Sequence, residues 1–361
     1  MPTSPPSPSR SQPGSQATRV LIVDDQPSVQ TLIRHALSRD PMIEVVGVAS
    51  DAYMAREMIK KLNPDVLTLD VEMPRMTGLE FLERLMRLRP MPVVMFSSVT
   101  QQGSDNAVRA LALGAVDVLP KPIAGMTQDA LEKLVSRVRT ASRVRRDASP
   151  APFPQDEPAL ETAQFGRWNG KVVLIGASTG GVAAVETVLR RMPNTCPPIV
   201  ISQHMPESFL VSFARRLDDL LPQHVQLARD GTEVEAGQIY LAPGGAEHTG
   251  IRRAGRKIQI ASIAAPKRNG HIPSVDELFM SGVETAENVV AVILTGLGKD
   301  GADGMAQLKR NGSVCIGQDE DTSVVYGMPR SAAELGILDA QLPLPQIAQA
   351  ICTACDAARR N

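Results

Sequence analysis

The sequence predicts an α/β protein made of two doubly wound parallel-sheet domains that are joined by a linker. Three observations lead to this prediction. Short apolar runs of strand length alternate with helix-length segments in two separate parts of the chain. A stretch rich in proline, alanine and acidic residues lies between these two parts. The length of 361 residues also suits two domains.

The first alternating part contains five strand-like segments, each followed by a helix-like segment. The strands are expected at 19–23, 43–49, 65–70, 92–97 and 115–120. The helices are expected after the first strand up to about residue 39, at 51–61, 79–88 and 103–113, and from about 127 to 139. Strands that are continuously apolar are typical of a parallel sheet covered by helices on both faces. Residues 19–140 are therefore expected to form a doubly wound domain.

Two segments beside this domain are expected to lack regular structure. Residues 1–18 open with MPTSPPSPSRSQPGSQ, and this proline and serine bias predicts a disordered tail. The tail has no apolar segment of the kind that a signal peptide needs. Residues 141–167 contain DASPAPFPQDEPALETAQF, which predicts a linker.

The second alternating part covers residues 168–358 and predicts a Rossmann-like α/β domain. Its strands are expected at 171–176, 198–203, 289–295 and 313–317. Its helices are expected at 180–191, 206–220, 274–287, 302–310 and 329–335. Two further strand-like segments, 238–242 and 248–262, suggest a β-hairpin or an insertion at the sheet edge.

Composition argues against several classes of protein. The formal net charge is −1, so no basic field indicates nucleic-acid binding. No stretch reaches the roughly 18 apolar residues that a membrane-spanning helix needs, so we expect no membrane insertion and a cytoplasmic location. The four scattered cysteines predict reduced thiols, and the pair Cys352 and Cys355 lacks a second ligand pair for zinc.

Polar residues follow the ends of the expected strands in the first domain. Asp24 and Asp25 follow the first strand, Asp70 ends the third, Ser97 ends the fourth, and Lys121 follows the fifth. The carboxyl ends of parallel strands meet at one edge of a sheet, so these side chains are expected to converge. Three close carboxylates repel one another unless a hard cation neutralises them, and Mg²⁺ suits oxygen ligands. A carboxylate beside Mg²⁺ can accept a phosphoryl group, whose oxygens a lysine and a hydroxyl can hold.

Residues 19–140 resemble the receiver domains of response regulators. The resemblance is carried by the acidic pair Asp24-Asp25, the segment LDVEMPRMTG around Asp70, Ser97, and Lys121-Pro122.

The resemblance implies a role for each of these residues. A partner histidine kinase would phosphorylate Asp70, and Ser97 and Lys121 would contact the phosphoryl group. The implied Mg²⁺ ligands are Asp24, Asp25, Asp70 and the backbone carbonyl of Glu72.

Three segments of the second domain also place polar residues at expected strand ends. Ser178 lies in IGASTGG (175–181), His204 in ISQHMP (201–206), and Asp300 in VILTGLGKDGADGM (292–305). These positions allow Ser178 to act as a nucleophile, His204 as its base and Asp300 as the group that fixes the imidazole tautomer. Backbone N–H groups of the glycine-rich loop can form an oxyanion hole.

Other interpretations of the second domain stay open at this point. His271, in NGHIPSVD (269–276), is a rival base. The glycines of LTGLGKDGAD match G-x-G-x-x-G after a strand, with Asp319 ending the next one, as in a dinucleotide-binding sensor. A non-enzymatic response-regulator output module is a third possibility. Nucleotide titration would distinguish the sensor, and an ester hydrolysis assay would distinguish the output module.

Residues 168–358 as a whole resemble the catalytic domains of chemotaxis protein-glutamate methylesterases. The matching segments, in chain order, are GASTGG, QHMP, APGG (242–245), HIPSVDELF (271–279), ILTGLGKDGADGM and VVYGMPRSAAELG (324–336). Two positions depart from the family pattern: Ile272 stands in place of a usual arginine, and Lys299 in place of a common asparagine.

This second resemblance implies an activity and its partners. The triad would be Ser178, His204 and Asp300, with the backbone N–H of Leu297 in the oxyanion hole. The enzyme would hydrolyse glutamate methyl esters on the cytoplasmic helices of chemoreceptors, and would also deamidate certain glutamines. Ester hydrolysis would need no cofactor, and a chemosensory histidine kinase would control it through the receiver.

Overall fold

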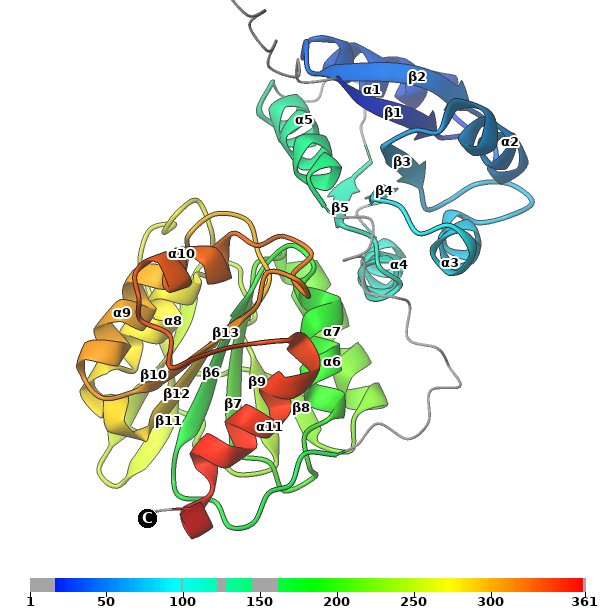
Figure 1. The fold of residues 1–361 in the computed structure, drawn as a ribbon. Coiled ribbons are helices and arrows are strands. Elements are labelled where there is room, and N and C mark those ends of the chain that lie inside the picture. The colour runs from blue at the N-terminus through cyan, green and yellow to red at the C-terminus, as the bar shows by residue number, and fades with distance from the viewer. Residues whose placement is uncertain (1–16, 99, 122–127, 145–161, 360–361) are drawn as a thin grey trace, which may run out of the picture.

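A computed structural model describes residues 17–98, 100–121, 128–144 and 162–359. These residues form two α/β domains, each built around its own parallel sheet (Figure 1). The predicted fold class is therefore confirmed. Most of the predicted tail and linker, and Pro122, lie outside the described residues.

The first domain contains a five-stranded sheet with the order β2-β1-β3-β4-β5, in which all neighbours are parallel. Its strands are β1 (Thr18–Val23), β2 (Ile43–Ala49), β3 (Val66–Asp70), β4 (Val93–Ser97) and β5 (Asp117–Pro120). Its helices are α1 (Pro27–Ser38), α2 (Ala52–Leu62), α3 (Gly78–Leu88), α4 (Gln101–Ala112) and α5 (Gln128–Ser142). Each element lies within a few residues of its predicted position.

Helix caps explain where two of these helices begin. The side chain of Asp51 accepts hydrogen bonds from the N–H groups of Tyr53 and Met54 at the start of α2. Thr77 and Glu80 form a reciprocal capping box at the start of α3. The capping box therefore anchors the loop that follows Asp70 at the point where it enters α3.

The second domain contains a seven-stranded sheet with the order β14-β13-β12-β6-β7-β9-β8, and every neighbouring pair is parallel. Its strands are β6 (Val172–Ala177), β7 (Ile199–Gln203), β8 (His224–Leu227), β9 (Gln238–Leu241), β12 (Val289–Ile293), β13 (Val314–Gln318) and β14 (Ala340–Leu342). Its α-helices are α6 (Gly181–Arg190), α7 (Glu207–Leu220), α8 (Val275–Ser281), α9 (Ala302–Arg310), α10 (Met328–Glu334) and α11 (Leu344–Cys355). Two 3₁₀ helices, η1 (Val283–Asn288) and η2 (Ala357–Arg359), complete the helical elements.

Two sequence predictions for this domain need correction. Segment 238–242 is not part of a hairpin, because β9 joins the parallel sheet between β7 and β8. Only β10 (His248–Ala254) and β11 (Lys257–Ile263) pair as an antiparallel hairpin. The helix expected over 274–287 ends at Ser281, and a separate 3₁₀ helix follows Gly282.

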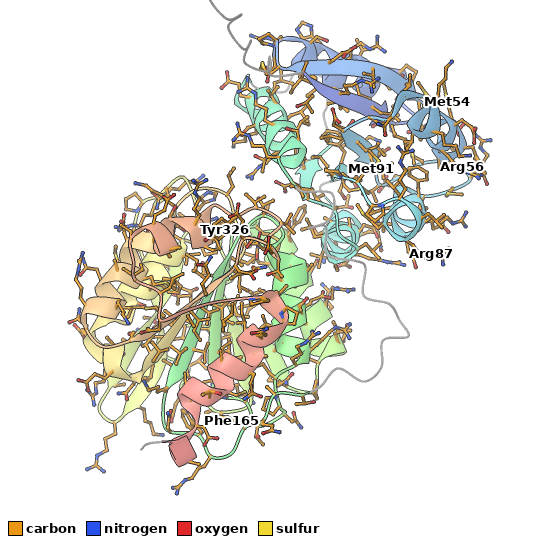
Figure 2. The ribbon with its side chains drawn as sticks, in the orientation of Figure 1. Met54, Arg56, Arg87, Met91, Phe165 and Tyr326 are labelled. Carbon is orange, nitrogen blue, oxygen red and sulfur yellow. The ribbon has the colours of Figure 1, made fainter. Side chains whose placement is uncertain are left out.

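The last part of the predicted linker packs on the second domain. The N–H of Ala163 donates to the carbonyl of Arg191 at 2.7 Å, and the N–H of Gln164 donates to the side chain of Gln349 at 2.8 Å. Figure 2 shows Phe165 beside α11, at the end of this domain that is far from the first domain. Residues 162–167 are therefore structurally part of the second domain.

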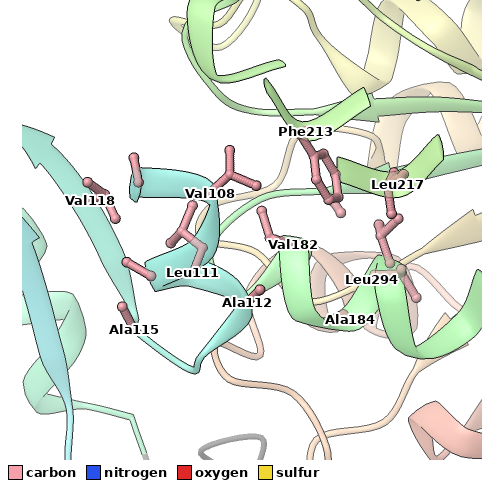
Figure 3. Close-up of a cluster of buried hydrophobic side chains, with 14 of the residues drawn as sticks. Val108, Leu111, Ala112, Ala115, Val118, Val182, Ala184, Phe213, Leu217 and Leu294 are labelled. Atoms are coloured by element: carbon pink, nitrogen blue, oxygen red, sulfur yellow. The ribbon is translucent and has the colours of Figure 1, made fainter. Parts of the chain in front are cut away.

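Helix α4 of the first domain packs directly on the second domain. Val108 and Leu111 lie in one apolar cluster with Val182 of α6 and Phe213 of α7 (Figure 3). All four side chains are buried. The two domains thus share a continuous apolar contact, with α4, β5 and α5 on the side of the first domain that faces the second (Figure 1).

The described residues contain no helix that is long and apolar enough to cross a membrane. All four cysteines are free, buried and in the second domain. Among the described residues, only the three aspartates discussed below are grouped so that they could hold a metal ion.

Candidate active site

The structure brings the predicted serine, histidine and aspartate into one hydrogen-bonded chain. Oγ of Ser178, just after β6, lies 3.2 Å from Nδ1 of His204, just after β7. Nε2 of the same imidazole lies 2.7 Å from Oδ2 of Asp300, in the loop between β12 and α9. Because β12, β6 and β7 are adjacent and parallel, their carboxyl ends place the three residues side by side.

The partners of His204 determine its tautomer. An ionised carboxylate can only accept hydrogen bonds, so Nε2 carries the proton that faces Asp300. The lone pair of Nδ1 then faces the hydroxyl of Ser178, as a general base requires. Burial on its own would raise the pKa of Asp300, but the hydrogen bond from His204 and other donors outweigh it and hold this pKa below its ordinary value. Asp300 is thus kept as the anion that stabilises an imidazolium.

Donors from the start of α8 hold Asp300 in place. Oδ1 accepts from Oγ of Ser274 at 2.9 Å, and Oδ2 accepts from the N–H of Val275 at 2.7 Å. The carboxylate is 2% exposed, so these hydrogen bonds replace the water that it has lost. They fix which oxygen points at His204.

The glycine-rich loop approaches the nucleophile closely. A Cβ atom on Gly296 would lie 2.8 Å from Cβ of Ser178, so a side chain cannot be accommodated there. The next residue is Leu297, the predicted source of the oxyanion N–H. No residue that the structure describes accepts a hydrogen bond from this N–H. It is therefore available for a ligand, and its catalytic role stays a prediction.

His271, the rival base, has a different position. Its ring stacks on that of His204, with centroids 3.8 Å apart and an interplanar angle of 7°. Burial and the neighbouring His204 lower the pKa of His271 to about 4, so its ring is neutral near pH 7. Among the described residues, the imidazole that contacts Oγ of Ser178 is that of His204.

The acidic residue of the dinucleotide fingerprint, Asp319, is engaged in local hydrogen bonds. Oδ1 of Asp319 accepts from the N–H and the hydroxyl of Thr322, at 3.0 and 2.6 Å, so it closes a local turn. A Cβ atom on Gly301 would contact Val275, so this glycine serves the packing of α8 against the loop. The glycines thus allow the loop to pack closely against Ser178 and against Val275, whose N–H binds Asp300.

The first domain contains a second site, at the carboxyl edge of its sheet. One carboxylate oxygen from each of Asp24, Asp25 and Asp70 can be chosen so that all three lie within 4.8 Å of one another. Nζ of Lys121 lies 2.6 Å from Oδ2 of Asp70. Burial raises the pKa of Asp24 to about 6, and it also raises the pKa of Asp70, although Lys121 opposes this second shift.

These residues fit a divalent cation. Oδ2 of Asp24 and Oδ1 of Asp25 are buried and have no hydrogen-bond partner among the described residues. Buried carboxylate oxygens without donors are costly, and a hard cation is the partner that suits them. The three aspartates would hold Mg²⁺, which would neutralise charge on an incoming phosphoryl group.

Two predicted residues of this site are placed differently from the others. Oγ of Ser97 donates to the carbonyl of Gly103 at 2.8 Å, so its hydroxyl must turn to reach a phosphoryl group. The N–H of Glu72 donates to Oδ1 of Asp70 at 3.3 Å. Ligation of the cation by the carbonyl of Glu72 stays a prediction.

Comparison with known proteins identifies the family. Residues 173–351 match the family model of the CheB methylesterase, and residues 20–136 match that of the response regulator receiver domain. A protein from Caulobacter vibrioides named protein-glutamate methylesterase/protein-glutamine glutaminase 1 is 49% identical over 346 residues, which cover 94% of this chain and 99% of that protein. The chain belongs to the CheB methylesterase family.

Two further comparisons describe other relatives of this CheB-family protein. A protein from Agrobacterium fabrum, named protein-glutamate methylesterase/protein-glutamine glutaminase, is 47% identical over 93% of this chain and 96% of its own length. The crystal structure of the Thermotoga maritima CheB methylesterase catalytic domain matches with 39% identity and a TM-score of 0.49, and covers 51% of this chain and 98% of that domain.

Two residues of the site in this CheB-family protein were not singled out from the sequence. They are the side-chain donors to Asp300, namely Asn269 and Ser274. Both lie in the segment NGHIPSVD, in which the sequence indicates His271 as a rival base and Asp276 as an alternative acid. The Asn-Gly pair at its start, which is typical of a tight turn, was the available signal.

Proposed function

We propose that this chain hydrolyses the methyl esters of glutamate residues on chemoreceptor helices and deamidates glutamine residues there. Ser178, His204 and Asp300 form the catalytic triad. The observation that carries this proposal is the hydrogen-bonded chain from Oγ of Ser178 through His204 to Asp300. The names of the relatives support the substrate, a glutamyl ester or glutaminyl amide in a protein.

The reaction follows from the direction of the hydrogen bonds. Oγ of Ser178 attacks the ester carbonyl while Nδ1 of His204 takes its proton, and the imidazolium is stabilised by Asp300. The N–H of Leu297 donates to the oxyanion. The intermediate collapses, and the leaving methoxide takes the proton from His204 and departs as methanol.

Hydrolysis of the acyl-enzyme completes the cycle. His204 takes a proton from a water molecule, which attacks the acyl carbonyl, and the proton then returns to Ser178. With a glutamine substrate the same sequence releases ammonia instead of methanol. No step of this chemistry needs a cofactor.

The receiver is proposed to be phosphorylated at Asp70 by a chemosensory histidine kinase in the cytoplasm. Mg²⁺ held by Asp24, Asp25 and Asp70 would be required, and Lys121 would pair with the phosphoryl oxygens. The close ion pair of Lys121 with Asp70 and the unpartnered oxygens of the acidic pair support this assignment.

The receiver is further proposed to restrain the esterase until it is phosphorylated. His204 and His271 line a cleft of about 570 Å³, which is also lined by receiver residues that include Val118, Leu134 and Arg137. The side chain of His204 is only 4% exposed. A helix with its side chains is roughly 10–12 Å across, so a receptor helix needs the space that the receiver occupies.

Methanol release from methylated chemoreceptors, measured with and without acetyl phosphate, tests the proposal. We expect release in both conditions and faster release with the phosphodonor. No methanol under either condition would refute the esterase assignment. Equal rates would refute the regulation while leaving the esterase in place.

A further inference from the structure

A tight turn over residues 268–271 contacts two members of the proposed triad at once. The N–H of Arg268 donates to the carbonyl of His271 at 3.2 Å, and the N–H of His271 donates back at 3.0 Å. The two central residues have positive φ, 52° at Asn269 and 84° at Gly270. An Asn-Gly pair suits this backbone, because asparagine and glycine tolerate the left-handed region.

The side chain of Asn269 points from this turn at two buried carboxylates. Its Nδ2 lies 2.9 Å from Oδ1 of Asp300 and 3.0 Å from Oδ2 of Asp276. Carboxylates can only accept, so the amide must present its nitrogen to both, with one N–H for each.

Asp276 is a second buried carboxyl group beside Asp300, and the amide of Asn269 bridges the two. Asp276 is fully buried, and its Oδ1 accepts from the N–H of Gly304 at 2.7 Å. Burial and the neighbouring Asp300 raise the pKa of Asp276, while the pKa of Asp300 is lowered. Two buried carboxyl groups that are close enough to share one donor repel each other when both are ionised. The amide shared between them offsets this repulsion.

The charged groups around the pair come from three elements. Arg268, on the turn, lies 3.7 Å from Oδ2 of Asp276 and pairs with Glu277 of α8 at 2.8 Å. Asp303 of α9 adds a further negative charge near Asp276. The local field is therefore mostly negative, and Asn269 is a neutral donor within it.

We infer that Asn269 is a positioning residue of the active site, because its amide holds Asp300 in the orientation that faces His204. This inference rests on the triad proposed above. His271, at the other end of the same turn, stacks on the ring of His204. The turn therefore fixes the aspartate through a hydrogen bond and the imidazole through a ring contact.

Asn269→Gly is the substitution that isolates the amide. Glycine retains the positive φ of the turn, so the backbone is kept while both hydrogen bonds are lost. Losing a charge-assisted hydrogen bond should lower kcat roughly tenfold to hundredfold, with KM unchanged. Asn311→Gly is the matched control. Asn311 also precedes a glycine in this domain, but its amide donates to the carbonyl of Gln307 at the exposed end of α9.

A double-mutant cycle with Asp300→Asn distinguishes positioning from a general structural effect. Methanol release by the full-length, phosphorylated enzyme is measured for both single variants and for the double variant. If Asn269 acts through Asp300, Asn269→Gly should slow the wild type but hardly affect the Asp300→Asn enzyme. Equal slowing in both backgrounds, or no slowing in the wild type, would overturn the inference. Wild-type turnover by Asp300→Asn would instead overturn the proposed triad.

Discussion

Nη1 of Arg215, on α7, lies 3.4 Å from Oδ2 of Asp105, on α4, so these two side chains form an ion pair across the domain interface. The two side chains are 51% and 37% exposed. Ion pairs with such exposure contribute little to stability, because water and salt screen them. A hydrogen bond from Nε2 of Gln101 to Oγ of Ser212, at 3.2 Å, also joins α4 to α7. Neutral hydrogen bonds contribute modestly, so we expect docking of the receiver to depend mainly on the apolar contacts of α4.

This contrast leads to a first prediction for two interface variants. Arg215→Ala should raise the unphosphorylated esterase rate by no more than about threefold, since exposed pairs are weak. Val108→Asp should raise it much further, because the new carboxylate would be buried against α6 and α7. Methanol release without phosphodonor compares the two. Phosphorylation of Val108→Asp with acetyl phosphate verifies that its receiver is still folded. A larger effect of Arg215→Ala would contradict this account of the interface.

A fragment beginning at Thr162 should be more active than the unphosphorylated full-length protein. It retains the contacts of Ala163 and Gln164 with the catalytic domain and loses the wall formed by the receiver. The tethered receiver has an effective concentration of roughly millimolar, so its removal should raise the rate on the order of tenfold. Methanol release measures this, and acetyl phosphate should have no effect on the fragment. A well-folded fragment that is no faster would show that the receiver activates the enzyme or targets it to receptors.

Ser178→Ala should reduce methanol release on the order of 10³-fold or more, because the members of a nucleophilic unit fail together. Asp300→Asn should also be severe, since the amide would favour the wrong tautomer of His204. Circular dichroism of both variants provides the control for folding. Near wild-type turnover in Ser178→Ala would rule out the serine mechanism.

Asp70→Asn should abolish phosphorylation by acetyl phosphate and leave the basal esterase rate unchanged. The amide cannot form the acyl phosphate, and Asp70 and Ser178 lie in different domains. Chelation of Mg²⁺ should have the same effect on the wild type. Mass spectrometry of the acetyl phosphate-treated proteins measures the outcome. A stable phosphate on Asp70→Asn would show that another residue is the acceptor.

Binding of Mg²⁺ to the receiver should depend on pH because of Asp24. Its pKa is raised to about 6, so the metal-free carboxyl is mostly protonated below that pH and mostly ionised above it. Protons and Mg²⁺ then compete, and affinity should fall by about tenfold per pH unit below pH 6 and level off above it. Calorimetric titrations between pH 5 and pH 8 test this. Asp24→Asn should bind more weakly and lose most of this pH dependence.

The strand ends could be predicted from the sequence because buried parallel strands are apolar runs, and the first polar residue after each run is conspicuous. Ser178, His204 and Asp70 could be placed on their sheet edges for this reason. Strands β8 and β14 could not be predicted, because they are short edge strands of mixed composition. The hydrogen bonds of Asn269 to Asp300 and Asp276 could not be predicted either. Those contacts require the turn at Asn269, the start of α8 and the loop that carries Asp300 to lie together, which tertiary packing determines.

The four buried cysteines can report on local opening of the catalytic domain. Burial raises the pKa of each of the four thiols to about 12, so almost no thiolate is present near neutral pH. All four lie in the catalytic domain. Reaction with a thiol reagent therefore has to wait for that domain to open, whatever the receiver is doing. The rate of thiol labelling in the wild-type protein would therefore measure how often the catalytic domain opens. A change in this rate on phosphorylation would show that the receiver affects the interior of the catalytic domain as well as the interface.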